Sequence, residues 1–419
     1  MRCLAAGGAV LTLLATGAAA QTPYVALVEP EPGVSVCPGG LCGADTLTAL
    51  FEALAATEAG TRDRPVHIVQ IGDSHTAGDR ITGGLRARMQ ARFGRGGRGV
   101  VQPGVPYAGY APFQIEVKAA DWPTTVAPLV GPAGAPTMRT GLAGARASVS
   151  GKTARLEITA EPAAAFSTVT VCGDGGPGAG ALALTTSAGD GVADFAMPEA
   201  APICISRSWP LMAERVSLRP VRGAVELHDL MLGRDGAGVT VSGLGQVGAT
   251  LRDLAARDEA VVATELASWR PSLIVLAFGT NEGFEDGLSA QTYEALLRDQ
   301  IARLRRLAPA ASLMLLGAPE ALKSGQTGGC GVEGARRAPA GLAMVREVQR
   351  RVAAETGVAF WDWHGRMGGD CSAERLATMA DPHMRPDRVH FTSAGAAWIG
   401  GVLSDDLLGA YDRWKADAR

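Results

Sequence analysis

The fold of this chain is decided by residues 67–76, HIVQIGDSHT, in which an apolar run leads into a turn that carries a serine. The run is typical of a strand buried in a parallel sheet. Apolar residues then recur every four positions, as one buried helix face requires: Ile81, Leu85, Met89 and Phe93. Gly94 ends this pattern. Ligands of open α/β sheets bind at the carboxyl ends of the strands, so Ser74 is a candidate nucleophile. The alternative is a serine that only caps a helix.

A second motif, DRVH, occupies residues 387–390 near the other end of the chain. An aspartate three residues before a histidine on a short loop can orient the imidazole. Its far nitrogen can then reach a serine hydroxyl, as nucleophilic acyl transfer requires. This spacing predicts His390 as the general base for Ser74 and Asp387 as the group that fixes its tautomer.

A third segment, residues 273–282, LIVLAFGTNE, is again a strand-like run, and it ends in a turn that carries Asn281. The side-chain amide of Asn281 can donate a hydrogen bond to an oxyanion.

With these residues the chain resembles the SGNH (GDSL-type) hydrolases. Four segments correspond to the sequence blocks of that family, in the same order: residues 72–74, GDS, 245–250, GQVGAT, 279–282, GTNE, and 387–390, DRVH. The resemblance implies an α/β fold, a three-layer sandwich around a central parallel sheet. It also implies an oxyanion hole formed by the backbone N–H groups of Ser74 and Gly248 and the amide of Asn281. Such a mechanism uses neither a cofactor nor a metal ion.

Some features of the chain are more specific. His75 stands where the family usually has leucine, and this GDSH form, with FWDW at 360–363 and MGG at 367–369, is most similar to the periplasmic peptidoglycan O-acetylesterases. The resemblance implies a serine esterase that removes O-acetyl groups from cell-wall glycan, peptidoglycan or another polysaccharide, through an acetyl-enzyme. Two alternative activities are a periplasmic polysaccharide O-acetyltransferase with the same triad and a general SGNH esterase or lipase. A glycan-binding module with a vestigial triad is disfavoured by the intact set of residues.

The N-terminus predicts export. Residues 1–20 combine Arg2, an apolar core and a small-residue end at Ala18 to Ala20, as signal peptides do. The apolar core is too short to span a bilayer comfortably, and no later apolar run of about 18 residues follows. We therefore expect a periplasmic or secreted protein after cleavage, without stable membrane insertion.

The cysteines agree with that compartment. Removal of residues 1–20 takes Cys3 away and leaves six cysteines in three local couples, which an oxidising compartment favours as disulfides: Cys37–Cys42, Cys172–Cys204 and Cys330–Cys371. The alternative is six buried thiols in a cytosolic protein. No Cys-x-x-Cys pair suggests a metal site.

Charge excludes other classes of partner. The chain has 39 Lys and Arg against 42 Asp and Glu, a formal net charge of −3, and no basic face for nucleic acid.

Residues 95–99, RGGRG, are expected to form a solvated turn, or alternatively to meet an anionic glycan. His383, close to Asp381 and His390, raises the idea of a metal site, but its spacing fits no metal motif. His228 has no visible partner.

The pattern of segments predicts an interrupted catalytic domain. Residues 21–104 and 235–419 alternate strand and helix patterns, and residues 105–234 contain short alternating runs rich in Gly, Pro and Thr. The runs are 147–158, 166–172, 215–221 and 224–232. They indicate an inserted β-sandwich, and the esterases that this chain resembles carry a carbohydrate-binding-like module at the same place. The alternative is a stabilising appendage without a ligand.

Before the first strand, Asp45 is expected to cap a helix.

Overall fold

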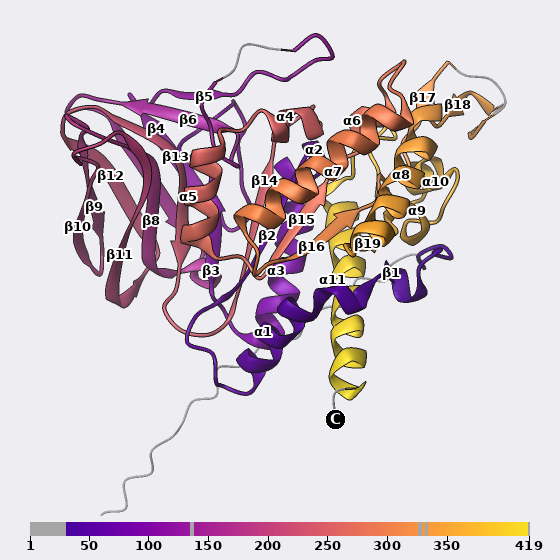
Figure 1. Cartoon of the computed structure of the whole chain (residues 1–419), viewed down its shortest axis with the longest axis horizontal. Helices are drawn as coiled ribbons and strands as arrows, with labels where there is room; N and C mark the ends of the chain where they lie inside the picture. Colours follow the sequence, from indigo (N-terminus) through magenta and orange to yellow (C-terminus); the bar gives the residue numbers. More distant parts are fainter. Residues whose placement is uncertain (1–30, 135–137, 326–328, 332–333, 418–419) are drawn as a thin grey trace, which may run out of the picture. The chain divides into compact units, whose positions relative to one another are not determined.

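The computed structural model describes residues 31–134, 138–325, 329–331 and 334–417, so the expected signal peptide lies outside them. A six-stranded sheet, in the order β1-β19-β16-β15-β2-β14, forms the centre of this part of the chain (Figure 1). Only β1, at one edge, is antiparallel; the other five strands are parallel. In chain order the strands are β1 Leu41–Cys42, β2 Val66–Gly72, β14 Val239–Gly245, β15 Leu273–Ala277, β16 Ser312–Leu316 and β19 Ala359–Trp361.

Helices cover both faces of this sheet, because alternate strand residues point to opposite sides. Val66 and Ile68 of β2 belong to the apolar core under α1 Thr48–Glu58, α3 Arg80–Phe93 and α11 Ser393–Asp417. Val69 and Ile71 belong to the core under α5 Glu259–Trp269, α7 Ala290–Leu307 and α8 Ala340–Thr356. The predicted three-layer α/β sandwich is thus confirmed, and so is the buried face of α3, which Gly94 ends with φ +89°.

Short helices connect these elements and carry most of the polar site described below. They are α2 Ser74–Ala77, α4 Leu251–Ala255, α6 Thr280–Gly283, α9 Trp363–Arg366 and α10 Ser372–Thr378, with 3-10 turns η1 Pro38–Gly40, η2 Ala44–Leu47 and η3 Pro162–Ala164. The expectation that Asp45 caps a helix is wrong. Asp45 lies inside η2, and its backbone oxygen accepts from Thr48 Oγ1, so the chain enters α1 through a 3-10 turn without a side-chain cap.

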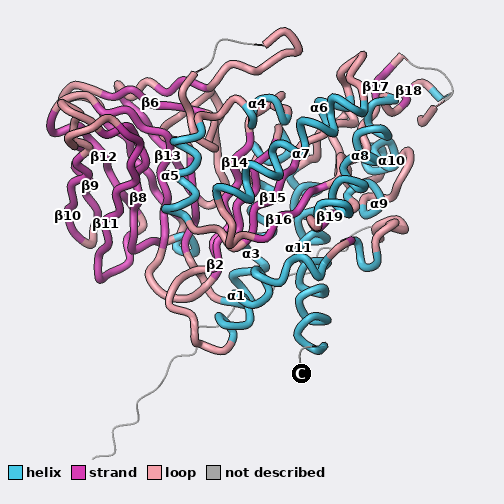
Figure 2. The backbone as a smooth tube through the Cα atoms, in the orientation of Figure 1, coloured by secondary structure: helices cyan, strands magenta, loops and turns pink. Residues whose placement is uncertain are grey.

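A β-rich region separates β2 and α3 from β14, and Figure 2 shows it as strands and loops. One sheet has the order β11-β8-β13-β6-β5, with β3 also paired to β13, and the other has the order β10-β9-β12-β7-β4. Apolar residues from both sheets pack into one separate core. The strands are β3 Gly97–Val101, β4 Ile115–Ala120, β5 Thr124–Val126, β6 Ala145–Val149, β7 Arg155–Ala160, β8 Phe166–Gly175, β9 Ala181–Thr186, β10 Gly189–Asp194, β11 Ala201–Ala213, β12 Arg215–Arg222 and β13 Val225–Gly233.

This region is the sheet-rich addition that the sequence predicted, with differences in detail. The run expected at 147–158 is two strands, β6 and β7, and the pattern did not predict β4, β5, β9, β10 or β11. Strand β3 begins before residue 105, so the domain limits 105 and 234 stay a prediction. Both interpretations of residues 95–99 fail for Arg98, which lies in β3 and is 2% exposed because its guanidinium pairs with Asp79.

All three predicted disulfides are present: Cys37–Cys42, Cys172–Cys204 and Cys330–Cys371. Cys172–Cys204 joins directly opposed residues of β8 and β11. Cys330–Cys371 joins the segment that contains β17 Lys323–Ser324 and β18 Arg336–Arg337 to the start of α10. Among the helices that the structure describes, none is both long and apolar enough to cross a bilayer.

Candidate active site

Three of the four sequence blocks meet because their strands end at the same level of the sheet. Gly72, the last residue of β2, lies opposite Gly245 of β14 on one side and Ala277 of β15 on the other. Each block follows its strand within a few residues. The parallel sheet therefore brings the turns that carry Ser74, Gly248 and Asn281 to one edge, where α/β proteins bind their ligands.

Ser74 is the first residue of α2, and Asp73 is the N-cap, whose carboxylate accepts a hydrogen bond from His75 N at 2.9 Å. The alternative that Ser74 caps the helix is therefore wrong. The turn is rigid because Asp73 is 1% exposed and its own N–H donates to the carbonyl of Ala277 at 3.4 Å. Ser74 itself is half-buried and lines a cleft at this edge of the sheet.

His75 joins this turn to the distant histidine loop. Its Nδ1 lies 3.1 Å from Asp73 Oδ1, and its Nε2 lies 2.9 Å from the backbone oxygen of Val389. Burial works to lower the pKa of His75, but the Asp73 carboxylate and the Val389 carbonyl outweigh it and hold that pKa above its usual value. A protonated His75 donates to both partners, so we assign it a positioning role; with both nitrogens engaged, it has none left to contact substrate.

The geometry of the predicted triad suits transfer of the serine proton to His390. Ser74 Oγ lies 3.0 Å from His390 Nε2, and His390 Nδ1 lies 2.8 Å from Asp387 Oδ2. The other oxygen of Asp387 accepts the backbone N–H groups of Val389 and His390 at 2.9 and 3.0 Å. Partial burial opposes ionisation, but these N–H groups and the imidazole hold the pKa of Asp387 below its usual value. An ionised Asp387 keeps the proton on Nδ1 and leaves Nε2 as the acceptor for the serine.

The turn between Asp387 and His390 is strained, and the sequence pattern did not reveal what holds it. Arg388 has φ +56°, which is unfavourable for a residue with a side chain. Its guanidinium makes two hydrogen bonds to the carboxylate of Glu374 on α10, at 3.0 and 3.1 Å. Its carbonyl accepts from Leu322 N at 3.1 Å. These contacts maintain the turn that presents Asp387 and His390 to the serine.

The second and third blocks are joined by side-chain hydrogen bonds. Asn281 Nδ2 donates to the backbone oxygen of Ala249 at 2.9 Å, which leaves one N–H of that amide for another acceptor. Gly248 has φ +79°, a left-handed backbone conformation that favours glycine. A Cβ there would lie 2.8 Å from the side chain of Leu129 in the β-rich region. Two of the three predicted oxyanion donors, Gly248 and Asn281, therefore lie on segments that contact each other or the β-rich region.

Glu282 also connects the two blocks, through hydrogen bonds to a backbone N–H group on each side. Its Oε1 accepts from Leu251 N, at the start of α4, at 2.8 Å, and its Oε2 accepts from Gly279 N at 3.0 Å. It is 1% exposed, and this burial raises its pKa to about 7 despite the two N–H donors. The sequence pattern gave Glu282 no role, although it directly follows Asn281, the only asparagine of the chain.

Ser74 and His390 open into a cleft of about 510 Å³. Arg80 and Arg385 also line it, and neither guanidinium pairs with a carboxylate among the residues that the structure describes. Arg80 lies over the ring of Phe113, with 5.4 Å between the guanidinium carbon and the ring centroid. The cleft therefore has a positive side next to the candidate nucleophile.

The remaining histidines have other surroundings. His67 is buried, with Nε2 2.7 Å from Ser242 Oγ, and its burial lowers its pKa to about 4. His228 has a partner after all, Asp174, at 3.2 Å. His383 Nδ1 lies 3.0 Å from the backbone oxygen of Asp381, which accounts for its proximity to that residue. A metal-compatible group occurs elsewhere, at Glu320, His364 and Asp370, where Arg346 also approaches Glu320 at 3.5 Å.

Comparisons with known proteins identify the type of domain that part of the chain forms. Residues 210–398 match the model of the GDSL-like Lipase/Acylhydrolase family. The matched range contains Gly248, Asn281, Asp387 and His390. It does not include Ser74, which precedes the β-rich region. A search of the curated proteins found no match.

Solved structures extend the comparison to the rest of the chain. A peptidoglycan O-acetylesterase is 26% identical, with a TM-score of 0.74 over 89% of this chain and 99% of that chain. A family two carbohydrate esterase from Clostridium thermocellum is 9% identical, with a TM-score of 0.30 over 63% of this chain and 93% of its own. An acetyl xylan esterase is 17% identical, with a TM-score of 0.31 over 42% of this chain and 81% of its own.

Proposed function

We propose that this protein, which carries a domain of the GDSL-like lipase/acylhydrolase family and is a carboxylic ester hydrolase, removes O-acetyl groups from a cell-wall glycan, peptidoglycan in particular. The observation that carries the proposal is the 3.0 Å contact between Ser74 Oγ and His390 Nε2 at a cleft that also contains two unpaired arginines. The similarity to a peptidoglycan O-acetylesterase over most of both chains supports the same substrate class.

In this mechanism Ser74 Oγ attacks the acetyl carbonyl while His390 Nε2 takes its proton, and ionised Asp387 stabilises the imidazolium. The backbone N–H groups of Ser74 and Gly248 and the free N–H of Asn281 donate to the tetrahedral oxyanion. His390 returns the proton to the sugar oxygen as it leaves. Water then attacks the acetyl-enzyme with His390 again as base, which releases acetate and restores Ser74.

The charge of the cleft favours an anionic substrate. The peptide stems of peptidoglycan carry carboxylates, whereas a neutral acetylated xylan carries none. Arg80 and Arg385 can attract such carboxylates toward Ser74, and the attraction should weaken as salt screens it. We expect KM for O-acetylated peptidoglycan to rise with ionic strength while KM for a neutral acetyl ester stays constant.

The proposed place of action is the periplasm or the outside of the cell, after removal of residues 1–20. Three disulfides support an oxidising compartment, because the cytosol keeps thiols reduced. A substrate in the cell wall requires the same location.

The deciding experiment measures acetate released from O-acetylated peptidoglycan, from acetylated xylan and from a long-chain ester by the same enzyme preparation. The proposal predicts the highest kcat/KM for peptidoglycan. Preference for the long-chain ester would indicate a general esterase or lipase. Acetyl groups appearing on an added glycan acceptor in place of free acetate would indicate an O-acetyltransferase.

A further inference from the structure

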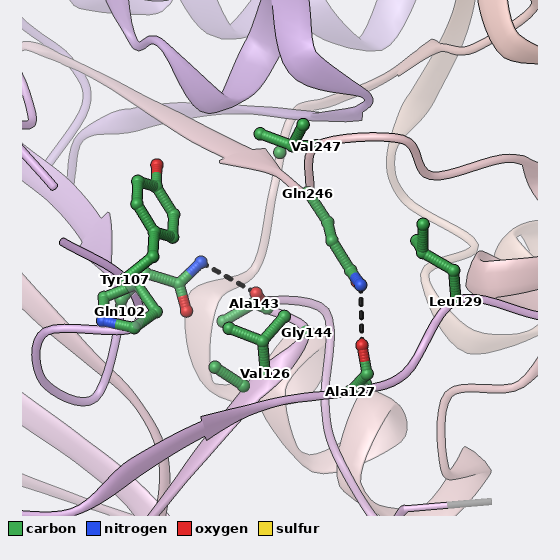
Figure 3. A pocket seen from close by; sticks show the side chains of 12 residues that line it. Gln102, Tyr107, Val126, Ala127, Leu129, Ala143, Gly144, Gln246 and Val247 are labelled. Carbon is green, nitrogen blue, oxygen red and sulfur yellow. Dashed lines mark hydrogen bonds between the residues drawn. The ribbon is translucent and has the colours of Figure 1, made fainter. Parts of the chain in front are cut away.

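A second cleft, of about 340 Å³, lies beside the catalytic one. Its walls come from the β-rich region and from the loop after β14: residues 102, 106–107, 126–127, 129, 143–145 and 245–247. Figure 3 shows Gln102 and Tyr107 on one side of it and Leu129 on the other, with Gln246 reaching across. The cleft therefore exists only because the β-rich region packs against the loop of the second sequence block.

The two clefts are neighbours. Tyr107 and Val247 line both of them, so a ligand that extends from Ser74 past these side chains enters the second cleft. The exposed fractions of the apolar rim are high: 42% for Tyr107, 46% for Leu129 and 60% for Val247. A chain of linked sugars is long enough to occupy both clefts, whereas a small acetyl ester occupies only the first.

The second cleft has one buried polar atom without a partner. Gln102 is 9% exposed, and its Nε2 donates to the carbonyl of Ala143 at 2.8 Å, so its amide orientation is fixed. Its Oε1 has no hydrogen-bond partner in the described part of the chain. A buried acceptor without a donor costs free energy, and a ligand N–H can supply the missing bond.

The other glutamine in the cleft has a different role. Gln246 Nε2 donates to the carbonyl of Ala127 at 2.7 Å, and its Oε1 accepts from Arg257. Both ends of its amide are therefore engaged within the protein. Gln246 holds the β-rich segment against the loop after β14, and Gln102 Oε1 is the amide oxygen of this cleft that has no partner among the described residues.

We infer that this cleft is a subsite for the 2-acetamido group of a sugar adjacent to the O-acetylated one. An acetamido group offers one N–H donor, for Gln102 Oε1, and one methyl group, for the apolar wall formed by Val126 and Leu129. The ring of Tyr107 provides a flat surface for the sugar. The inference rests on the proposed function only in taking the substrate to be a glycan, and it adds which substituent the enzyme recognises.

The first test fills the cleft. Val126→Trp places a large ring among its walls, and Thr125→Trp is the matched control, because adjacent residues of β5 point to opposite faces and Thr125 is exposed. We expect the ratio of kcat/KM on O-acetylated peptidoglycan to kcat/KM on an aryl acetate to fall at least about tenfold in Val126→Trp, while Thr125→Trp keeps the wild-type ratio. An equal loss on both substrates in Val126→Trp would overturn the subsite.

The second test measures binding without catalysis, on the full chain. Chitotriose carries 2-acetamido groups and cellotriose does not. We expect chitotriose to bind the wild-type protein, and its Kd to rise at least about tenfold in Gln102→Met, which removes the Oε1 acceptor together with the Nε2 donor to Ala143. Absence of chitotriose binding, equal binding of cellotriose, or an unchanged Kd in Gln102→Met would each overturn the assignment.

The two proposals fail separately. If the wild-type enzyme binds chitotriose through Gln102 but releases no acetate from O-acetylated peptidoglycan, the subsite stands and the proposed function fails. If it releases acetate but neither variant behaves as expected, the proposed function stands and the subsite fails.

Discussion

Asp387 and His390 lie on a loop where their side chains are 46% and 36% exposed, whereas Asp253 and Glu282, which hold the segments of the predicted oxyanion donors, are 2% and 1% exposed. Asp387 and His390 bond to each other and to N–H groups of their own loop, and Glu374 and Leu322 hold the strained turn between them. The second pair connects separate segments. Asp253 accepts from Thr250 N at 2.7 Å and from Val130 N, in the β-rich region, at 2.8 Å.

This difference separates activity from stability. A substitution on the triad side should remove chemistry with little effect on folding, since the affected side chains are partly in water. A substitution on the oxyanion side should lower both, because it leaves backbone N–H or C=O groups without their hydrogen-bond partners. Three substitutions test this contrast, and a fourth tests a buried carboxyl pair outside the site.

Ser74→Ala should have the largest effect on activity. The triad acts as a unit, so we expect kcat on a small acetyl ester to fall by about 10⁴-fold or more. The thermal midpoint should not change, because within the described residues the hydroxyl hydrogen-bonds only to His390, which is partly exposed. Activity close to that of the wild type would remove Ser74 from the mechanism.

Asn281→Ala should follow. Loss of one oxyanion donor lowers kcat by about 10²–10³-fold. The same substitution removes the donor to Ala249 O and should destabilise the fold by about 1 kcal/mol, measured by denaturant unfolding. A wild-type kcat with reduced stability would mean that Asn281 only joins the two loops.

Glu282→Gln should lower both quantities moderately. Its amide nitrogen cannot accept from Leu251 N or Gly279 N, so one buried N–H loses its acceptor, at about 1–3 kcal/mol. We expect kcat to fall about tenfold, because the segments that carry the oxyanion donors shift, while KM changes little. Asp286→Asn, at a fully exposed side chain nearby, is the control and should match the wild type.

The smallest effect concerns pH. Glu265 on α5 and Asp229 on β13 are fully buried. Burial raises the pKa of Glu265 to about 7, and burial together with the neighbouring Glu265 raises the pKa of Asp229 well above its usual range. The folded state then binds more protons than the unfolded state between the ordinary glutamate pKa and 7. Stability should therefore fall as pH rises through this window.

Glu265→Gln tests that link between the β-rich region and α5. The variant should lose much of the pH dependence of its unfolding free energy between pH 5 and pH 8, whereas Glu259→Gln, at an exposed position of the same helix, should keep it. An unchanged slope in Glu265→Gln would show that the carboxyl pair does not control the pH dependence of stability.

The sequence predicted the central sheet well, because each of its long strands is buried on both faces and therefore appears as a continuous apolar run, as in residues 273–278. The β-rich region was harder. Strand β11 has mostly exposed or half-buried residues, so no apolar alternation marks it, and only its pairing with β8 makes it a strand. The three disulfide pairs could be predicted because each joins cysteines close in the chain.

For the candidate site, the sequence by itself determined which chemical groups are present and which strand each follows: Ser74, Asn281 and the Asp387–His390 pair are each recognisable from a few adjacent residues. Only the tertiary structure decided how they are held. Glu282, the Arg388–Glu374 pair and the bridge of His75 to Val389 depend on contacts between segments 14 to 314 residues apart. Local spacing encodes the groups that react, whereas buried partners far along the chain become visible only when folding brings their segments together.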